Sequence, residues 1–140
     1  MEPDNFLLRP ENLLFAIAAV VSGLMLLWPL ISRKTVTEID TTAAIKLINY
    51  QNAQVVDVRD DSEFAAGHLP DSKHIPAEKM SERWYELEKY KENPIVMIYK
   101  SGARTSKPSS ILHKNGFTQV HDLKGGIDAW RRANLPIVKR

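Results

Sequence analysis

The sequence contains no cysteine, and this absence excludes more chemistry than any other feature of the composition. Without thiols the chain forms no disulfide, no thiolate metal or iron–sulfur site and no cysteine nucleophile. The chain also has no large excess of one charge, since it contains 19 Lys and Arg and 17 Asp and Glu. The formal net charge of +2 is too small for a nucleic-acid-binding surface, so we expect no nucleic-acid partner. The length of 140 residues, 44% of them hydrophobic, suits one domain with a core.

The sequence also lacks the residue spacing that is typical of a metal site. The chain has 4 histidines, and none of them lies in a pattern typical of a metal site: His68, His74, His113 and His121. We therefore expect no metal ion and no cofactor.

Charged residues are missing from the whole stretch between Leu13 and Ile31. As a helix this stretch is roughly 28 Å long, close to the ~30 Å hydrocarbon core of a bilayer. Trp28 lies where an interfacial aromatic anchor is expected. The sequence predicts a transmembrane helix over residues 13–31 after a short N-terminal tail, residues 1–12. A cleaved signal peptide and a buried core helix are the alternatives, and the acidic tail and the length of the apolar run disfavour both.

Positive charges beside the predicted span set its orientation. The N-terminal flank carries only Arg9, whereas Arg33 and Lys34 follow the span directly. The positive-inside rule then places the C-terminal side in the cytoplasm, as a single-pass protein with its N-terminus outside. A short linker, residues 32–37, is expected to join the membrane helix to a soluble domain, residues 38–140.

Strand-like and helix-like segments alternate through the soluble part, which predicts an α/β fold with a parallel sheet and helices on both faces. The expected strands cover residues 36–39, 54–58, 74–75, 95–99 and 120–123. The expected helices cover residues 41–49, 62–66, 82–91, 109–115 and 126–132.

A glycine-containing loop follows the predicted strand 95–99. In a parallel sheet such loops meet at the carboxyl ends of the strands, where ligands bind. Backbone N–H groups of the loop, together with two cationic side chains, would form an anion cradle. The residues of this predicted anion-binding loop are Lys100, Ser101, Gly102, Ala103 and Arg104. A plain strand-to-helix connection is the alternative reading of the same loop.

Three motifs in this order resemble those of rhodanese-like domains. The first, Val56–Pro70, contains Val-Asp-Val-Arg, Glu-Phe and Gly-His-Leu-Pro. The last, Asp122–Trp130, reads Asp-Leu-Lys-Gly-Gly-Ile-Asp-Ala-Trp and is followed by Leu135-Pro136. Between them, Pro94–Arg104 is similar to the strand and active-site loop of the family. The resemblance implies a rhodanese fold and a sulfurtransferase, or less often a phosphatase, built on one cysteine at the start of that loop.

Two departures from the family pattern bear on this activity. A gapless match places Tyr99 at the position of the cysteine, and a phenol with a pKa near 10 forms no persulfide. We therefore predict no catalytic residue. Pro108 lies only four residues after Arg104, so the following helix is expected to begin late, with Ser106 or Lys107 as its cap and Pro108 in its first turn.

The remaining signature residues are expected to be structural. They are Asp57, Arg59, Glu63, Gly67, His68, Gly125, Gly126 and Trp130. The first three are interpreted as a charge network, the glycine pair as a tight strand-to-helix turn, and the tryptophan as core.

Three hypotheses about function follow. The favoured one is a membrane-anchored, non-catalytic module that binds a protein partner at the cytoplasmic membrane face. The second is a binder of small anions or sulfur species through residues 100–104, without turnover. The third is a thiosulfate sulfurtransferase, which the resemblance alone would assign but for which the sequence supplies no nucleophile. The sequence thus favours a protein that is not an enzyme.

Overall fold

The computed structural model describes residues 6, 9–31, 36–101 and 107–139, without the side chains of residues 29–31. The chain forms two compact units, Met1–Lys34 and Thr35–Arg140. Each unit is a body of its own and is described separately.

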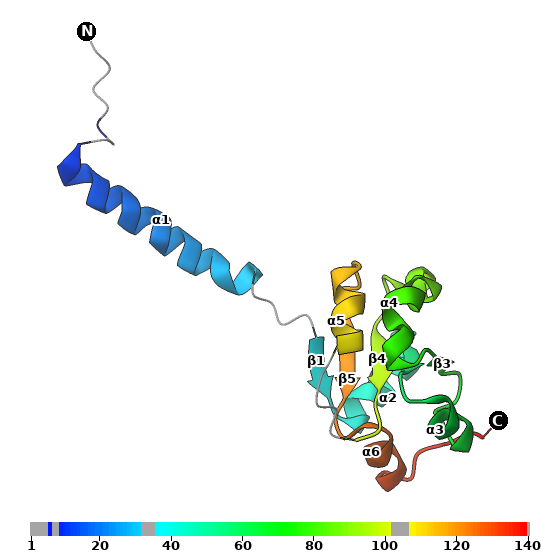
Figure 1. Ribbon diagram of the computed structural model, residues 1–140. Helices are drawn as coiled ribbons and strands as arrows, with labels where there is room; N and C mark the ends of the chain where they lie inside the picture. Colours follow the sequence, from blue (N-terminus) through cyan, green and yellow to red (C-terminus); the bar gives the residue numbers. More distant parts are fainter. Residues whose placement is uncertain (1–5, 7–8, 32–35, 102–106, 140) are drawn as a thin grey trace. The chain divides into compact units, whose positions relative to one another are not determined.

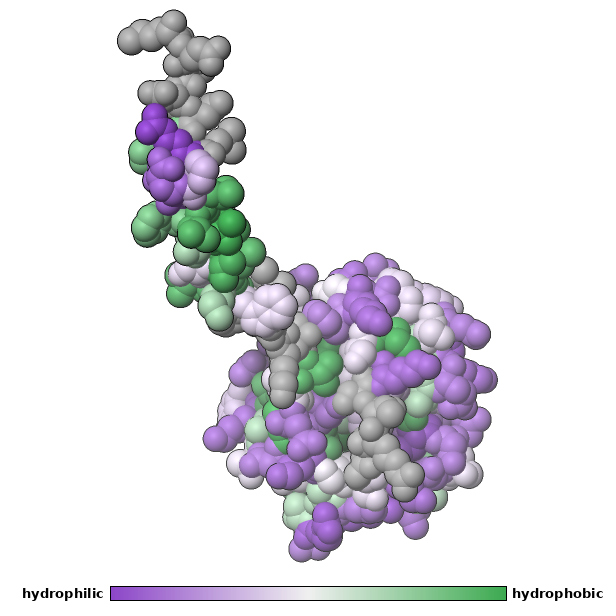
Figure 2. All heavy atoms as spheres, turned by 60° about the vertical axis from the view of Figure 1, so that its left-hand side comes forward, coloured by the Kyte–Doolittle hydropathy of each residue, from purple (hydrophilic) through white to green (hydrophobic). Residues whose placement is uncertain are grey.

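The first unit contains one long helix, α1 (Pro10–Ile31). Within it, the segment Pro10–Trp28 is long and apolar enough to cross a membrane, and none of its most apolar part is buried within the protein. Figure 2 shows hydrophobic side chains along most of this helix and polar ones near its beginning. The predicted apolar helix over residues 13–31 is therefore present, and it begins three residues earlier.

The second unit is built on a parallel sheet with the strand order β1-β5-β4-β2-β3. Its strands in the described residues are β1 (Val36–Ile39), β2 (Gln54–Asp57), β3 (Lys73–His74), β4 (Ile95–Ile98) and β5 (Val120–Leu123). This arrangement confirms the predicted α/β class with a parallel sheet (Figure 1). Val36 and Thr37, which the sequence analysis placed both in the linker and in the first expected strand, pair with Val120 and His121 of β5.

Helices connect the strands. They are α2 (Thr41–Tyr50), α3 (Asp61–Ala66), α4 (Met80–Arg83), α5 (Lys107–Lys114) and α6 (Gly126–Arg132), with the 3-10 helices η2 (Ala77–Lys79) and η3 (Trp84–Tyr90). The carboxylates of Asp40 and Asp60 accept hydrogen bonds from the amides of Ala43 and Glu63, both at 2.8 Å, and so cap α2 and α3.

Alternating residues of the central strand β4 divide the core between the two faces of the sheet. Ile95 and Met97 pack on the face covered by α4, η3 and α5, whose buried residues include Met80, Leu87 and Leu112. Val96 and Ile98 pack on the face covered by α2 and α6, whose buried residues include Ala44, Ile127 and Trp130. This alternation is the side-chain period of a strand buried on both faces.

One predicted helix differs in type. Residues 82–91 were expected to form a single amphipathic α-helix, but the chain forms α4 up to Arg83 and the 3-10 helix η3 from Trp84. The inward residues Trp84, Leu87 and Tyr90 recur at every third position. A spacing of three matches the three residues per turn of a 3-10 helix, so this geometry brings all three to one face.

Candidate site at the carboxyl edge of the sheet

Segments that follow β2, β4 and β5 meet at the carboxyl edge of the sheet because the strands are parallel. The segment after β4 continues into Tyr99, Lys100 and Ser101, of which the last two are exposed. Gly102, Ala103 and Arg104, the other members of the predicted anion-binding loop, lie outside the described residues. The anion-binding hypothesis therefore stays a prediction.

Acidic side chains lie near Lys100 at this edge. Hydrogen bonds from the Glu63 amide and the Ser62 hydroxyl lower the pKa of Asp60, and the charge of Lys100 lowers it further. Burial raises the pKa of Glu63, while Lys100 acts in the opposite direction. Lys100 thus lies close enough to two carboxylates of the chain to affect their pKa.

The Tyr99 side chain points toward α5, on the same face as Met97. Its hydroxyl and the Ser109 hydroxyl are 2.9 Å apart, and Ser109 donates in turn to the buried carboxylate of Asp122. Burial raises the pKa of Tyr99 to about 12. The phenol is therefore neutral at physiological pH and joins β4 to α5 and β5. Nothing in this arrangement makes it a nucleophile.

We expect the Tyr99→Phe variant to lose about 1 kcal/mol of unfolding free energy, because the hydroxyl is hydrogen-bonded inside the domain. The measurement is urea unfolding of the full chain in detergent, followed by tryptophan fluorescence. Tyr85→Phe is the matched control, since Tyr85 is 59% exposed. Equal effects of the two substitutions would contradict a stabilising role for the hydrogen bond to Ser109.

The backbone of α6 approaches the segment after β4 very closely. The amide of Ile127 donates to the carbonyl of Tyr99 at 2.8 Å. A Cβ atom at Gly126 would lie 2.2 Å from that carbonyl oxygen and 2.6 Å from the carbonyl oxygen of Lys100. The glycine pair predicted to allow a tight turn does so with positive φ at both positions, 74° at Gly125 and 56° at Gly126. It also fixes the backbone at which the loop begins.

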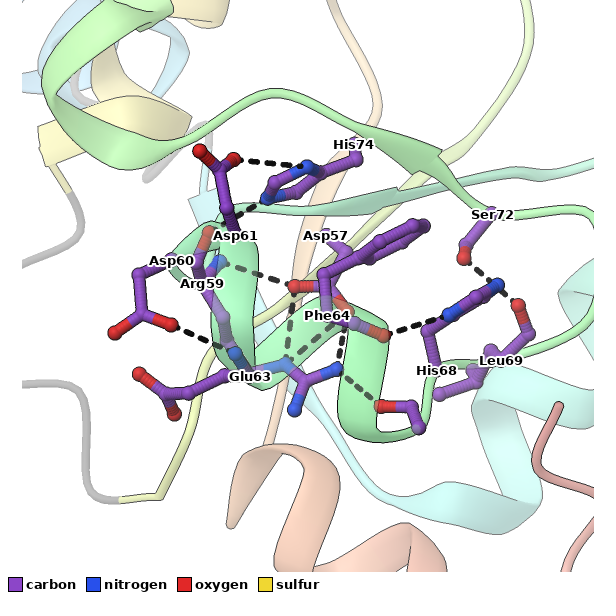
Figure 3. Close-up of polar contacts among 11 residues, drawn as sticks. Asp57, Arg59, Asp60, Asp61, Glu63, Phe64, His68, Leu69, Ser72 and His74 are labelled. Atoms are coloured by element: carbon purple, nitrogen blue, oxygen red, sulfur yellow. Dashed lines mark hydrogen bonds and ion pairs between the residues drawn. The ribbon is translucent and has the colours of Figure 1, made fainter. Parts of the chain in front are cut away.

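Asp57 and Arg59 form a buried ion pair at the end of β2 (Figure 3). The Arg59 guanidinium donates to both carboxylate oxygens of Asp57, at 2.7 Å for the shortest contact, and to the carbonyl oxygen of Gly67 at 2.7 Å. The Arg59 amide also donates to Asp57. The charge of Arg59 also acts on Glu63, where it lowers the pKa of the carboxyl against the effect of burial. The pair therefore joins the end of β2 to the residue that follows α3.

An aromatic stack covers the same region. The ring of Phe64 lies between His68 and His74, with centroid distances of 3.8 Å and 4.3 Å (Figure 3). His68 Nδ1 lies 2.8 Å from the Phe64 carbonyl oxygen, and His74 Nε2 lies 2.8 Å from the Arg59 carbonyl oxygen. The backbone of His68 pairs with Val138 in an antiparallel bridge. These contacts place both histidines in a packed framework.

The described residues contain no cluster of three His, Asp or Glu side chains that could hold a metal ion. Trp130 is buried in the core, and its Nε1 donates to the Pro136 carbonyl at 2.9 Å. Pro108 is the second residue of α5, which begins at Lys107. The late start of this helix stays a prediction, because residues 102–106 lie outside the described residues.

Sequence reasoning missed Ser109 as a partner of Tyr99. The hydrogen bonds from Tyr99 through Ser109 to Asp122 join the end of β4, α5 and β5, and only the folded chain brings these elements together. One signal was available, since the alternation of β4 already places residue 99 on the face of Ile95 and Met97.

These features define the class of protein: an α/β domain with a strand-to-helix loop at the carboxyl edge of a parallel sheet and no thiol beside it. The family described as Rhodanese-like domain matches residues 40–133. The chain belongs to the rhodanese-like domain family.

Relatives include proteins with and without a named activity. The chain is 39% identical over 97 residues to "Uncharacterized protein YibN" of Escherichia coli K12, covering 69% of this chain and 68% of that protein. It is 36% identical over 104 residues to "Thiosulfate sulfurtransferase GlpE" of Actinobacillus pleuropneumoniae serotype 5b, covering 74% of this chain and 94% of that protein.

A solved structure shares the fold. The rhodanese-related protein of Thermoplasma volcanium superposes with a TM-score of 0.65 at 26% identity, covering 74% of this chain and 99% of that chain. The sheet and its flanking helices are therefore those of the rhodanese fold.

Proposed function

We propose that this protein is a membrane-anchored rhodanese-like domain that carries out no thiolate sulfur transfer and instead binds a protein partner at the cytoplasmic membrane face. The observation that carries the proposal is the absence of any cysteine from a chain that keeps the rhodanese scaffold. A thiolate is the nucleophile that persulfide chemistry requires. Tyr99, which stands at the start of the loop, is held inward by its hydrogen bond with Ser109, and burial raises its pKa to about 12.

The membrane part of the proposal rests on α1. Its segment Pro10–Trp28 has the length and composition of a span. Arg33 and Lys34 follow the helix and favour a cytoplasmic domain. A domain held at a membrane without an active thiolate suits recruitment of a partner better than turnover of a diffusing sulfur donor.

Crosslinking in native membranes tests this function. The full-length protein is compared with a version whose residues 13–31 are replaced by an unrelated span. We expect one partner in stoichiometric amount, retained after the exchange, because recognition would lie on the soluble domain. Loss of the partner on exchange would assign recognition to the helix, and no partner with either version would contradict the proposal.

Restoring a cysteine gives a second prediction. We expect Tyr99→Cys to form thiocyanate from thiosulfate and cyanide at less than about a hundredth of the rate of the A. pleuropneumoniae GlpE protein. The physical reason is the late helix start that the sequence predicts around Pro108, which would leave fewer N–H donors for the loop. Robust turnover by this single variant would contradict the predicted effect of Pro108 on the loop.

A further inference from the structure

An apolar groove lies on the face of the sheet covered by α2 and α6. Its volume is about 350 Å³. The residues that line it are Ile45, Ile48, Asn49, Val55, Leu69, Pro70, Asp71, Trp130, Leu135 and Pro136. Since α2 leads back to the start of β2, Asn49 and Val55 place the groove toward the amino ends of the strands. It is therefore distinct from the candidate site at the carboxyl edge.

Hydrogen bonds hold the walls of the groove in place. The Trp130 indole donates to the Pro136 carbonyl at 2.9 Å and fixes the segment after α6. The backbone bridge between His68 and Val138 holds the same segment from its other end. Gln54 Nε2 donates to the Asp71 carbonyl at 3.1 Å and fixes the turn at the mouth. A groove formed in advance avoids much of the ordering cost of binding.

Charge at the mouth comes from one residue. Asp71 is the only charged side chain among the groove residues, and it is exposed. No ion pair within the described part of the chain involves it. Lys139 lies on a neighbouring hollow that Asp71 also lines. The apolar interior thus suits an apolar group, and the carboxylate at its edge suits a cation.

We propose that this groove binds a segment of the partner protein that inserts one large apolar side chain and places a Lys or Arg side chain against Asp71. This inference rests on the proposed function and names the surface that performs it. The volume is at the lower end of ligand pockets and accommodates a single anchoring side chain. Interfaces concentrate their binding energy in such anchors, with charged residues at the rim.

Site-specific photo-crosslinking of the full-length protein in native membranes tests the inference. One version carries the photoreactive residue at position 136, at the groove, and another at position 85 in η3, where Tyr85 is exposed on the opposite face. We expect position 136 to crosslink to one partner segment, identified by mass spectrometry, in which a large apolar residue lies beside Lys or Arg.

Charge variants make the test specific. Asp71→Lys is expected to reduce the crosslink yield at position 136 about tenfold, because the new lysine would repel the Lys or Arg side chain of the partner. Glu82→Lys makes the same charge change at an exposed position of α4 and is expected to leave the yield unchanged. Lys139→Ala is expected to raise the yield, since it removes a competing cation. Unchanged thermal unfolding of all three variants confirms that they fold.

Four results would overturn the inference. An Asp71→Lys variant with undiminished yield, or a crosslinked segment without the apolar and basic pair, would rule out this recognition chemistry. A partner that crosslinks only at position 85 would rule out the groove and leave the proposed function standing. The absence of any partner at both positions would contradict the groove and the proposed function together.

Discussion

The Gly126→Ala variant is expected to lose about 4 kcal/mol of unfolding free energy, a value at the upper end for single substitutions. The added Cβ would lie 2.2 Å from the Tyr99 carbonyl oxygen and 2.6 Å from that of Lys100. Both obstacles are backbone atoms, so the start of α6 or the end of β4 must move. The positive φ of 56° adds strain for any residue with a Cβ.

Gly116→Ala is the matched control for this variant. Gly116 also has a positive φ, 93°, but the atom nearest its Cβ would be the Cε of Lys91, at 2.9 Å. The Lys91 side chain is flexible and moves aside, so only the backbone strain of roughly 1–2 kcal/mol remains. Urea unfolding of both variants separates the steric cost of the added Cβ from the cost of the positive φ. Equal losses of unfolding free energy in the two variants would show that the close approach of α6 to Tyr99 does not add to the cost of the substitution.

Asp57→Ala is expected to cost about 3–5 kcal/mol, because it leaves the Arg59 guanidinium buried without its counter-charge. The hydrogen bond from Arg59 to the Gly67 carbonyl would remain, but this carbonyl carries no full negative charge. The measurement is again urea unfolding of the full chain in detergent. The expected loss comes from the stranded charge, so Asp57→Leu combined with Arg59→Met is expected to be more stable than Asp57→Ala alone.

A surface pair provides the control. Arg83 and Glu86 are also joined by a short contact, 2.6 Å, but both side chains are partly exposed. Glu86→Ala is expected to cost less than about 1 kcal/mol, since water solvates the remaining arginine. A similar loss in Glu86→Ala and Asp57→Ala would contradict the structural role assigned to the buried pair.

Much of the fold was predictable because its elements are set by local patterns. The bounds of β1, β5 and α6 agree with the prediction to the residue, and Asp40 caps α2 as expected. Clear local signals mark the two helices: a capping carboxylate before α2 and a glycine pair at the start of α6. The 3-10 helix from Trp84 was harder to predict, because apolar residues at every third position fit one side of an α-helix as well as a 3-10 helix.

The site was predictable only in part. The ion pair of Asp57 and Arg59 follows from the signature motif, and the structure shows both residues buried and bonded to each other. The link from Tyr99 through Ser109 to Asp122 was not predictable, because it joins residues distant in the chain through α5 and β5. The role of Gly126 was half predicted: its turn was expected, but its approach to the Tyr99 carbonyl depends on tertiary packing.

Sulfur transfer by the unmodified protein is the most direct measurement of the central claim, that this chain keeps the rhodanese scaffold without thiolate chemistry. Full-length protein is incubated with thiosulfate and cyanide beside the GlpE protein of A. pleuropneumoniae, and thiocyanate is measured. The account predicts no thiocyanate above the uncatalysed background, because the chain has no cysteine and its Tyr99 phenol stays protonated. Sustained turnover by the unmodified chain would contradict it.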